Sequence, residues 1–350
     1  MAEFTNQAMI IADQNDPTAE QRKKDHIELA FKSQIASGEL DRRFFYEPIL
    51  AAHPTSGSYP EQDFLGFRMR APLWVSSMTG GTKLAKTINH NLARACGEFG
   101  FGMGLGSCRS LLNSDDHLSD FAVKAHLPNQ PLFANLGIAQ VEQLFQQKQG
   151  DKILHLLEKL QADGLIIHVN PLQEWLQPEG DRFQQSPLAT IEEALQQLDV
   201  PIIVKEVGQG MGYESLKALL QLPLAAVDFA ANGGTNFAML ELLRSDPLQQ
   251  AAYQPLTKIG HSAEDMVLLV NQLKTELGNK LQVEHIIISG GIKTFLDGYY
   301  LVQKIESKAI YGQASAFLTH ARGSYEELRQ YVATQIAGLE LAQAYLKIRP

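Results

Sequence analysis

Three glycine-rich segments carry residues suited to binding a phosphate group. Each follows a short apolar run: Gly80-Gly81-Thr82, Gly233-Gly234-Thr235 and Gly290-Gly291-Ile292-Lys293. Glycine allows backbone N–H groups to approach a phosphate closely, and a helix N-terminus adds a favourable dipole. For any one pair, the simpler interpretation is a tight turn between a strand and a helix. Three pairs, with Ala314-Ser315 after the last apolar run, together favour a bound phosphate.

Lys205 lies within the apolar run IIVKEVG at residues 202–208. A lysine in such a strand is rarely buried without a partner. If its side chain points into the interior of the fold, an anionic edge of a cofactor is its natural counter-charge. If it does not, Asp228 in the next apolar run is the expected partner. The pattern leaves both alternatives open.

Small polar residues in two other runs are candidates to hydrogen-bond a planar heterocycle. Ser77, Met78 and Thr79 lie at the end of the first run, and Asn135 lies at the end of the third. Their alternative role is that of satisfied polar groups in the core.

The segment IIHVNPLQEWLQPEGDRF contains His168, Asn170, Gln173 and Glu174. Pro171 discourages continuation of the preceding strand, which places the polar residues on a loop at its end. Glu174 supplies the hard oxygen ligand that Mg2+ prefers, above all when phosphate oxygens complete the coordination shell. Taken alone, however, the residues favour a solvated loop glutamate. Gln173 is uncharged, so it orients or donates a hydrogen bond and is a poor general base.

Four basic residues outside these runs complete the candidate set: Arg22, Lys23, His26 and Arg109. The first three share neighbouring faces of a predicted helix, and their simpler interpretation is a solvated surface. Arg109 has its own alternative, an ion pair with Asp115 or Asp116. Together the four would form a cationic patch suited to a diphosphate.

Eight short apolar runs position these residues, and most are followed by a helical pattern. Continuous apolar runs are typical of strands buried on both faces, as in parallel sheets. The runs occupy residues 75–78, 103–107, 132–137, 165–170, 202–208, 226–232, 286–291 and 310–315. Eight such units predict an α/β fold, a closed (β/α)8 TIM barrel with its active site at the carboxyl ends of the strands.

The remaining segments predict an N-terminal helical extension and a helical shell. A helix is expected from residues 17–18 to Ala36, with Ile27, Phe31 and Ile35 as its apolar stripe. Residues 64–70 alternate and are expected to form a plug strand at the base of the barrel. Further helices are expected at residues 83–98, 138–161, 188–198 and 325–346, and the long gap at 232–284 predicts an elaborated loop. We expect residues 1–62 to form an extension that contributes to the substrate site, and residues 63–350 to form the barrel.

The chain has 350 residues, of which 45% are hydrophobic, enough to bury the core of one large barrel. Its formal net charge of -9 argues against nucleic acid or an anionic membrane as a partner, but not against a phosphorylated small substrate. Two cysteines, Cys96 and Cys108, are too few for a disulfide framework. Neither a signal peptide nor a membrane-spanning segment is evident. We therefore expect a soluble, cytoplasmic protein.

The chain resembles the type 2, flavin-dependent isopentenyl-diphosphate isomerases from about Arg22 to Leu318. The resemblance rests on the motifs RKKDHI, SSMTGG, GLGSCRS, FANLG, HVNPLQEWLQPEGDR, IVKEVG, GGTNF and ISGGI, in the order of that family. The glutamine–glutamate segment with PEGDR is highly specific, whereas GGT and SGGI recur in other flavin barrels.

The resemblance implies an FMN-bound TIM barrel that converts isopentenyl diphosphate to dimethylallyl diphosphate. It also implies that Mg2+ is required, that NADPH keeps the FMN reduced, and that the protein is a homo-oligomer, a tetramer or octamer. Because the reaction has no net redox change, reduced flavin is expected to act as the acid–base catalyst. A 1,3-proton shift on an unactivated alkene needs a proton donor and acceptor close to carbon, and the chain itself offers no convincing acid–base pair.

Carried over residue by residue, the resemblance assigns the candidates to four roles. Gln173 would be the catalytic residue in contact with substrate, and Glu174 would hold Mg2+. The substrate would be bound by Arg22, Lys23, His26, Arg109, His168, Asn170 and Gln173. FMN would be bound by Ser77, Met78, Thr79, Ser107, Asn135, Lys205, Thr235, Gly291, Ile292, Lys293, Ala314 and Ser315.

The sequence departs from the family pattern at Cys108, where glutamine is more usual, at Lys258–Asp265 and at Glu306-Ser307-Lys308. Three other functions compete with the isomerase. An FMN-dependent α-hydroxyacid oxidase needs a His–Arg pair near the seventh strand, and ISGGIKT contains no such histidine. An IMP dehydrogenase-like reaction needs a catalytic cysteine, for which Cys108 is a candidate without the surrounding loop. An inactive FMN-binding or assembly protein is the alternative outside enzymes.

Overall fold

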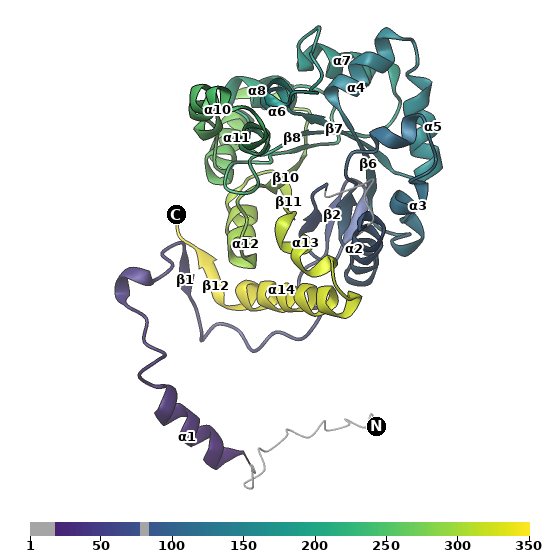
Figure 1. Ribbon diagram of the computed structural model, residues 1–350. Helices are drawn as coiled ribbons and strands as arrows, with labels where there is room; N and C mark the ends of the chain where they lie inside the picture. Colours follow the sequence, from purple (N-terminus) through teal and green to yellow (C-terminus); the bar gives the residue numbers. More distant parts are fainter. Residues whose placement is uncertain (1–17, 78–83) are drawn as a thin grey trace. The chain divides into compact units, whose positions relative to one another are not determined.

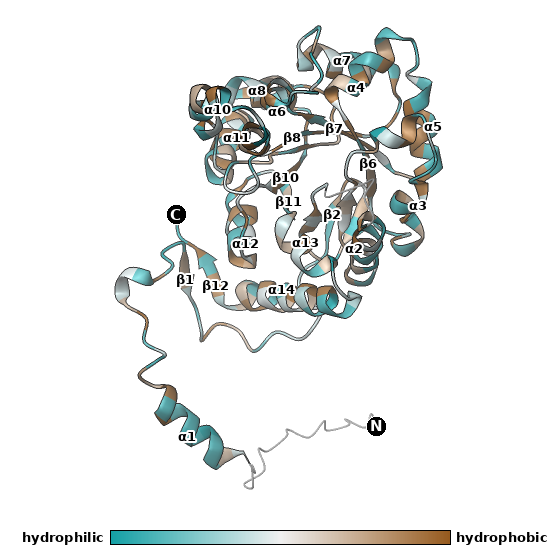
Figure 2. Ribbon diagram, viewed as in Figure 1, coloured by the Kyte–Doolittle hydropathy of each residue, from teal (hydrophilic) through white to brown (hydrophobic). Residues whose placement is uncertain are grey.

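The computed structural model describes residues 18–77 and 84–350. Eight parallel strands pair into a closed barrel surrounded by helices (Figure 1), which confirms the predicted fold class. The barrel strands are β4 (Leu73–Val75), β5 (Gly102–Gly104), β6 (Leu132–Gly137), β7 (Gly164–Val169), β8 (Ile202–Glu206), β9 (Ala226–Asp228), β10 (His285–Ser289) and β11 (Lys308–Gln313). Pairing of β11 with β4 closes the ring. The strands are predominantly hydrophobic (Figure 2), as strands buried on both faces must be.

Every predicted apolar run overlaps one barrel strand, but the first overlaps only at Val75. That strand begins at Leu73, and Ser76 and Ser77 follow it. Leu73 and Trp74 are fully buried. The serines therefore lie at the rim, at the carboxyl end of β4.

Strand register separates the side chains of β7 and β8 into two sets. His168 is paired in register with Lys205, and Lys205 with Asp228, so these three side chains point to the same side of the sheet. Val204 and Glu206 point to the other side, because successive residues of a strand alternate. They line a cavity together with residues of the covering helices. His168, Lys205 and Asp228 therefore face the barrel interior.

A shell of helices covers the barrel. It comprises α2 (Ala85–Phe99), α3 (Leu118–Phe121), α4 (Ile138–Gln146), α5 (Asp151–Leu160), α6 (Pro171–Leu176), α7 (Pro187–Gln197), α8 (Tyr213–Leu220), α9 (Phe237–Arg244), α10 (Pro247–Tyr253), α11 (Ala263–Leu277), α12 (Phe295–Lys304), α13 (Ser315–Ala321) and α14 (Tyr325–Tyr345). Short 3-10 helices occur at η1 (Ser37–Glu39), η2 (Arg109–Leu112), η3 (Lys124–His126), η4 (Gln254–Lys258) and η5 (Gly278–Lys280). Helices α9 to α11 occupy the long gap at 232–284, so the elaborated loop is confirmed. Within the described ranges, no helix has both the length and the apolar character needed to cross a bilayer.

Two predicted elements of the barrel region were wrong in detail. The single helix expected at residues 138–161 is two helices, because Lys148 adopts a left-handed φ of 55° between Gln146 and Asp151. The plug strand at 64–70 is a hairpin of β2 (Gln62–Phe64) and β3 (Phe67–Met69), because Leu65 and Gly66 both adopt positive φ. The Phe64 ring packs edge-on against His285 at the start of β10, with centroids 4.9 Å apart. The hairpin therefore does lie at the base of the barrel.

The chain divides into two compact units, one ending at Phe44 and including Arg349, and the other running from Phe45 to Ile348 with Pro350. The larger unit also contains β1 (Phe44–Tyr46) from its second residue and β12 (Leu346–Ile348). The boundary expected from the sequence was residue 62 instead. Residues 45–62 join the larger unit because the Gly57 and Ser58 N–H groups donate to Glu340 of α14, at 2.6 and 3.1 Å.

The smaller unit contains α1 (Ala19–Leu29), which is shorter than the helix expected up to Ala36 and mostly hydrophilic (Figure 2). None of its residues is buried. A helix without a buried face has only its intrinsic propensity to extend it, which explains its early end.

Replacing Glu340 with alanine is expected to lower the free energy of unfolding of the larger unit. Glu340 is only 6% exposed, and its loss leaves the Gly57 N–H without its acceptor, whereas the Ser58 N–H keeps the Thr55 carbonyl at 3.1 Å. A hydrogen bond to a charged group contributes about 1.5–3 kcal/mol. Urea unfolding followed by circular dichroism measures the change. Gln330→Ala, at an exposed position of the same helix, is the control. Equal stability of the two variants would contradict a stabilising role for the hydrogen bonds to Glu340.

Candidate active site

Polar side chains from adjacent strands meet inside the carboxyl end of the barrel. His168 Nδ1 lies 2.7 Å from the Asn135 side-chain oxygen, and the Asn135 amide nitrogen donates to the Leu105 carbonyl at 3.0 Å. Since that amide oxygen is an acceptor, Nδ1 carries the proton and Nε2 keeps its lone pair in the neutral ring. The structure thus brings together Asn135, predicted to bind the cofactor, and His168, predicted to bind the substrate.

Burial, together with the smaller effect of the nearby Lys205, lowers the pKa of His168 to about 4. The ring is therefore neutral at neutral pH and adds no positive charge of its own. A dianionic ligand placed beside Nε2 would raise this pKa, because an opposite charge favours the protonated form.

The structure decides between the two orientations of Lys205 that the sequence left open. The side chain is only 9% exposed and faces the interior, where Nζ donates to the Glu206 carbonyl at 2.7 Å. Within residues 18–77 and 84–350 it makes no ion pair with a carboxylate. Asp228 shares the interior face, but one of its oxygens accepts from the Ser289 hydroxyl and the other has no partner. Burial raises the pKa of Asp228, against the opposing effects of Lys205 and Ser289.

A second group of site residues is held together at the start of α6. Asn170 precedes this helix, Pro171 occupies its first turn, and the Asn170 amide donates to both Gln173 (3.1 Å) and Glu174 (2.9 Å). The Asn170 side-chain oxygen is buried and has no partner. The other Glu174 oxygen accepts from the Asp181 backbone N–H at 2.7 Å. Glu174 is therefore fixed in orientation.

The PEGDR turn, residues 178–182, follows Glu174 in the chain and holds it in place. The Arg182 guanidinium donates to the Glu174 carbonyl at 2.6 Å and lies over the Trp175 ring, 4.9 Å from its centroid. Gly180 packs so closely that a Cβ there would lie 2.0 Å from the Glu174 carbonyl oxygen. This turn is thus structural, in agreement with its sequence.

Arg109 pairs with Asp181 at 3.0 Å, so the pairing with Asp115 or Asp116 suggested by the sequence was wrong. Asp115 instead pairs with Lys159. The reason is tertiary: the PEGDR turn and the loop after β5 meet at the rim. Through Asp181, Arg109 and Glu174 belong to one network, although 65 residues separate them in the chain.

The glycine loops after β9 and β10 pack against each other. Gly290 has a φ of +89°, and a Cβ there would lie 2.0 Å from the Ala231 carbonyl oxygen. This close approach accounts for Gly290 without a ligand. The other predicted cofactor residues in this region lie at or near the carboxyl ends of β5, β9, β10 and β11 and are exposed, except for half-buried Gly291 and Ile292. They are Ser107, Thr235, Gly291, Ile292, Lys293, Ala314 and Ser315.

The remaining predicted residues fall into two groups. Ser77 is half-buried after β4, and its hydroxyl has no partner, whereas Met78 and Thr79 lie outside the described residues. Arg22, Lys23 and His26 are exposed on α1, which belongs to the smaller unit. Their predicted role in the substrate site therefore stays a prediction.

Sequence reasoning missed two residues that organise the site. Asp181 joins Arg109 and Glu174, and Glu206 accepts three backbone N–H groups of the loop after β8. The segment Glu206-Val-Gly-Gln-Gly carried a signal, since an acidic side chain beside a glycine loop commonly satisfies its N–H groups.

A metal site made by the protein alone is not formed in residues 18–77 and 84–350. No group of three or more His, Cys, Asp or Glu side chains there surrounds a possible metal position. Within these ranges, Glu174 therefore belongs to no metal site formed by protein ligands alone.

Solved structures with similar folds include a flavocytochrome b2 and a mandelate oxidase. A flavocytochrome b2 variant with sulfite bound has a TM-score of 0.59 at 16% identity, covering 91% of this chain and 78% of that one. A mandelate oxidase with 3,3-difluoro-2-hydroxy-3-phenylpropionic acid has a TM-score of 0.53 at 14% identity, covering 88% of each chain. At this identity the likeness concerns the fold. Fold and site together define a (β/α)8-barrel protein with a polar cluster at the carboxyl ends of its strands.

Curated relatives identify the family. The chain is 34% identical over 326 residues to the isopentenyl-diphosphate delta-isomerase of Rickettsia felis, covering 92% of this chain and 91% of the relative. It is 33% identical over 326 residues to the enzyme of the same name from Rickettsia africae, covering 92% of each. No family model matches the chain. The chain belongs to the isopentenyl-diphosphate delta-isomerase family, and the predicted resemblance is confirmed.

The pKa of His168 predicts a pH-dependent stability. Its folded value of about 4 lies below the ordinary 6.5, so the unfolded chain binds a proton first as the pH falls. The free energy of unfolding should therefore fall between about pH 6.5 and pH 4. His168→Asn, whose amide can replace Nδ1 as a donor, should reduce this slope in urea unfolding at several pH values.

His155→Asn, at an exposed position on α5, is the matched control and should keep the parent slope. Identical slopes for the parent and His168→Asn would contradict the neutral, buried state of the His168 ring.

Proposed function

We propose that this protein interconverts isopentenyl diphosphate and dimethylallyl diphosphate by a 1,3-allylic proton shift, using reduced FMN and Mg2+. The observation that carries the proposal is the family membership over nine-tenths of the chain, with 34% identity to the Rickettsia felis isomerase. The site supports it, because most of the residues assigned by resemblance that the larger unit contains gather at one barrel rim.

Two features of the barrel interior suit the ring system of FMN. Lys205 is a buried cation without a carboxylate partner in the part of the chain that the structure describes, so an anionic flavin edge would supply its counter-charge. The Ser77 hydroxyl and Asn170 side-chain oxygen are polar atoms without partners and would gain hydrogen bonds. The flavin-binding barrels with similar folds support the same cofactor.

When bound, reduced FMN would supply both the proton donor and the proton acceptor for the allylic shift. The residues of this chain then have positioning tasks. Gln173, held by Asn170 at 3.1 Å, would contact the substrate and orient it without taking its proton. Glu174 would take one position in the shell of an Mg2+ ion whose other ligands include diphosphate oxygens.

Charge at the rim supports a diphosphate substrate. Arg109 is 58% exposed at its side chain and stands beside the Glu174 segment through Asp181. We propose that Arg109 and His168, with Arg22, Lys23 and His26 of the smaller unit, bind the two phosphates, because guanidinium groups and phosphates form bidentate hydrogen bonds.

We further propose that NADPH reduces the FMN, that the protein is a homo-oligomer of four or eight copies, and that it is located in the cytoplasm. Exposed apolar residues of the elaborated loop support an interface between copies: Leu243 is 69% exposed and Leu248 79%.

Competing functions lose support at named positions. Cys108 is fully buried, and burial raises the pKa of its thiol to about 12, which removes the thiolate that a dehydrogenase of the IMP type needs. The loop after β10 offers no histidine for a hydroxyacid oxidase.

Isomerase turnover tests the function. The purified protein with FMN, NADPH, Mg2+ and isopentenyl diphosphate should release the allylic isomer, detected by mass spectrometry after its acid hydrolysis. Gln173→Ala should lower kcat at least tenfold, because the substrate loses a contact made near the reacting carbons. Gln177→Ala, just beyond α6, is the control and should retain activity. Absence of product from the parent would refute the proposal.

Lys205→Ala should weaken FMN binding at least tenfold, because it removes the only cation on the interior face of β8. Flavin fluorescence quenching measures the dissociation constant. Lys217→Ala on α8, outside the barrel, is the control, and equal constants for both variants would exclude Lys205 from the flavin site.

A further inference from the structure

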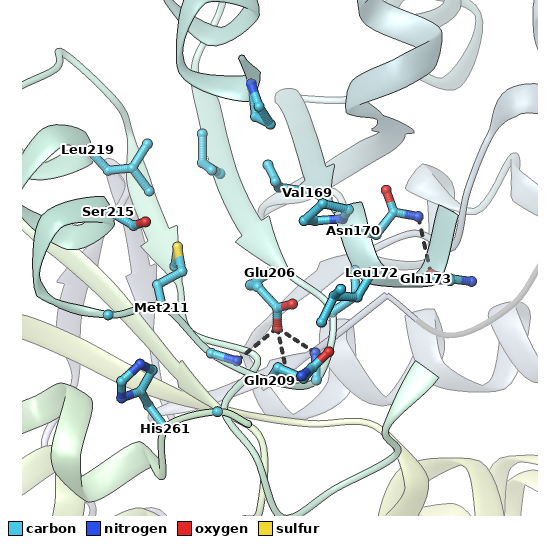
Figure 3. A pocket seen from close by; sticks show the side chains of 18 of the residues that line it. Val169, Asn170, Leu172, Gln173, Glu206, Gln209, Met211, Ser215, Leu219 and His261 are labelled. Carbon is cyan, nitrogen blue, oxygen red and sulfur yellow. Dashed lines mark hydrogen bonds between the residues drawn. The ribbon is translucent and has the colours of Figure 1, made fainter. Parts of the chain in front are cut away.

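A cavity of about 550 Å³ lies outside the barrel, between β7–β8 and the covering helices. Its volume falls within the roughly 300–1,000 Å³ typical of small-molecule sites. Figure 3 shows Val169, Met211 and Leu219 around it, with Glu206 near its middle. Of the residues assigned above to substrate, cofactor or metal, only Asn170 and Gln173 line this cavity.

The two chambers lie on opposite faces of the same strands. Lys205 points into the barrel, whereas Val204 and Glu206, its neighbours in β8, line the outer cavity. The strand wall thus separates the cavity from the interior cluster.

The charged residues that line this cavity disfavour binding of the diphosphate. Its described lining includes two carboxylates, Glu206 and Glu214, and one histidine, His261, but neither lysine nor arginine. An anion would find no permanently charged cation there and would be repelled by the carboxylates. The ligand must therefore be neutral or cationic.

Glu206 offers one free hydrogen-bond acceptor inside the apolar walls. Its Oε2 accepts from the backbone N–H groups of Gly208, Gln209 and Gly210 at 2.6, 2.7 and 2.9 Å (Figure 3). Its Oε1 has no hydrogen bond to any residue that the structure describes. Glu206 is half-buried, and a ligand in the cavity that donates a hydrogen bond would pair with this oxygen.

We propose that this cavity binds an aliphatic alcohol or amine, whose hydroxyl or ammonium group donates to Oε1 of Glu206 and whose chain packs on the apolar walls. The occupant contacts α6, because Leu172 and Gln173 also line the cavity. α6 packs on α9 through a small hydrophobic cluster of Leu172, Leu176, Ala238 and Leu242. The site therefore lies against the helix that carries Gln173 and Glu174.

Calorimetric titration of the full chain with octylamine, octanol and octanoate tests the site. Octylamine and octanol should each bind once, and octanoate at least tenfold more weakly than octylamine. Ala218→Phe, which fills the cavity from α8, should weaken octylamine binding at least tenfold. Gln196→Phe, at an exposed position of α7 outside the cavity, should leave it unchanged.

Ser215→Phe serves the same purpose if Ala218→Phe does not fold. Glu206→Gln should reduce binding of octylamine much more than binding of octanol, because it removes the charge and keeps the shape. Equal affinities for octanoate and octylamine, or equal octylamine affinities of the filled and control variants, would overturn the proposal.

Trp175 reports on the contact with α6. The chain has two tryptophans, and the other, Trp74, is fully buried in the barrel. Octylamine should change the fluorescence in the parent but not in Trp175→Phe, and an unchanged parent signal at saturation would overturn contact with α6. These readouts use no isomerase turnover, so failure of the proposed function leaves them interpretable.

Discussion

Closure of eight parallel strands into one ring is the constraint on which the rest of the structure depends. A closed sheet has two faces only, and successive side chains must alternate between them. In β8, this rule sends Lys205 inward and Glu206 outward, although they are adjacent in the chain. One strand end therefore serves two chambers of opposite charge preference, a cationic interior and an acidic outer cavity.

Burial then sets the charge states of the interior. Removing His168 from water keeps its ring neutral, and Lys205 reinforces this effect. Lys205 itself remains a buried cation with a carbonyl as its hydrogen-bond acceptor. Such a charge is costly in a low-dielectric interior, so the arrangement favours an anionic occupant over an empty barrel.

The short helix α6 links this interior to the rim. Six residues long, it cannot hold its own position by helix propensity. Asn170 ties its first turn, the Asp181 N–H and the Arg182 guanidinium hold Glu174 from the other side, and Leu172 and Leu176 pack on α9. The PEGDR sequence thus matters through the orientation of Glu174 rather than through ligands of its own.

The sequence by itself determined the barrel, the order of its strands and the residues at their ends, because apolar runs and turn glycines are local signals. It also determined the family, through motifs such as HVNPLQEWLQPEGDR. Only the tertiary structure decided that Lys205 faces inward without Asp228 as an ion-pair partner, that Arg109 pairs with Asp181, and that residues 45–62 join the barrel unit. These outcomes depend on strand register and on contacts between loops distant in the chain. A local pattern carries no information about either, since both follow from how the whole ring closes.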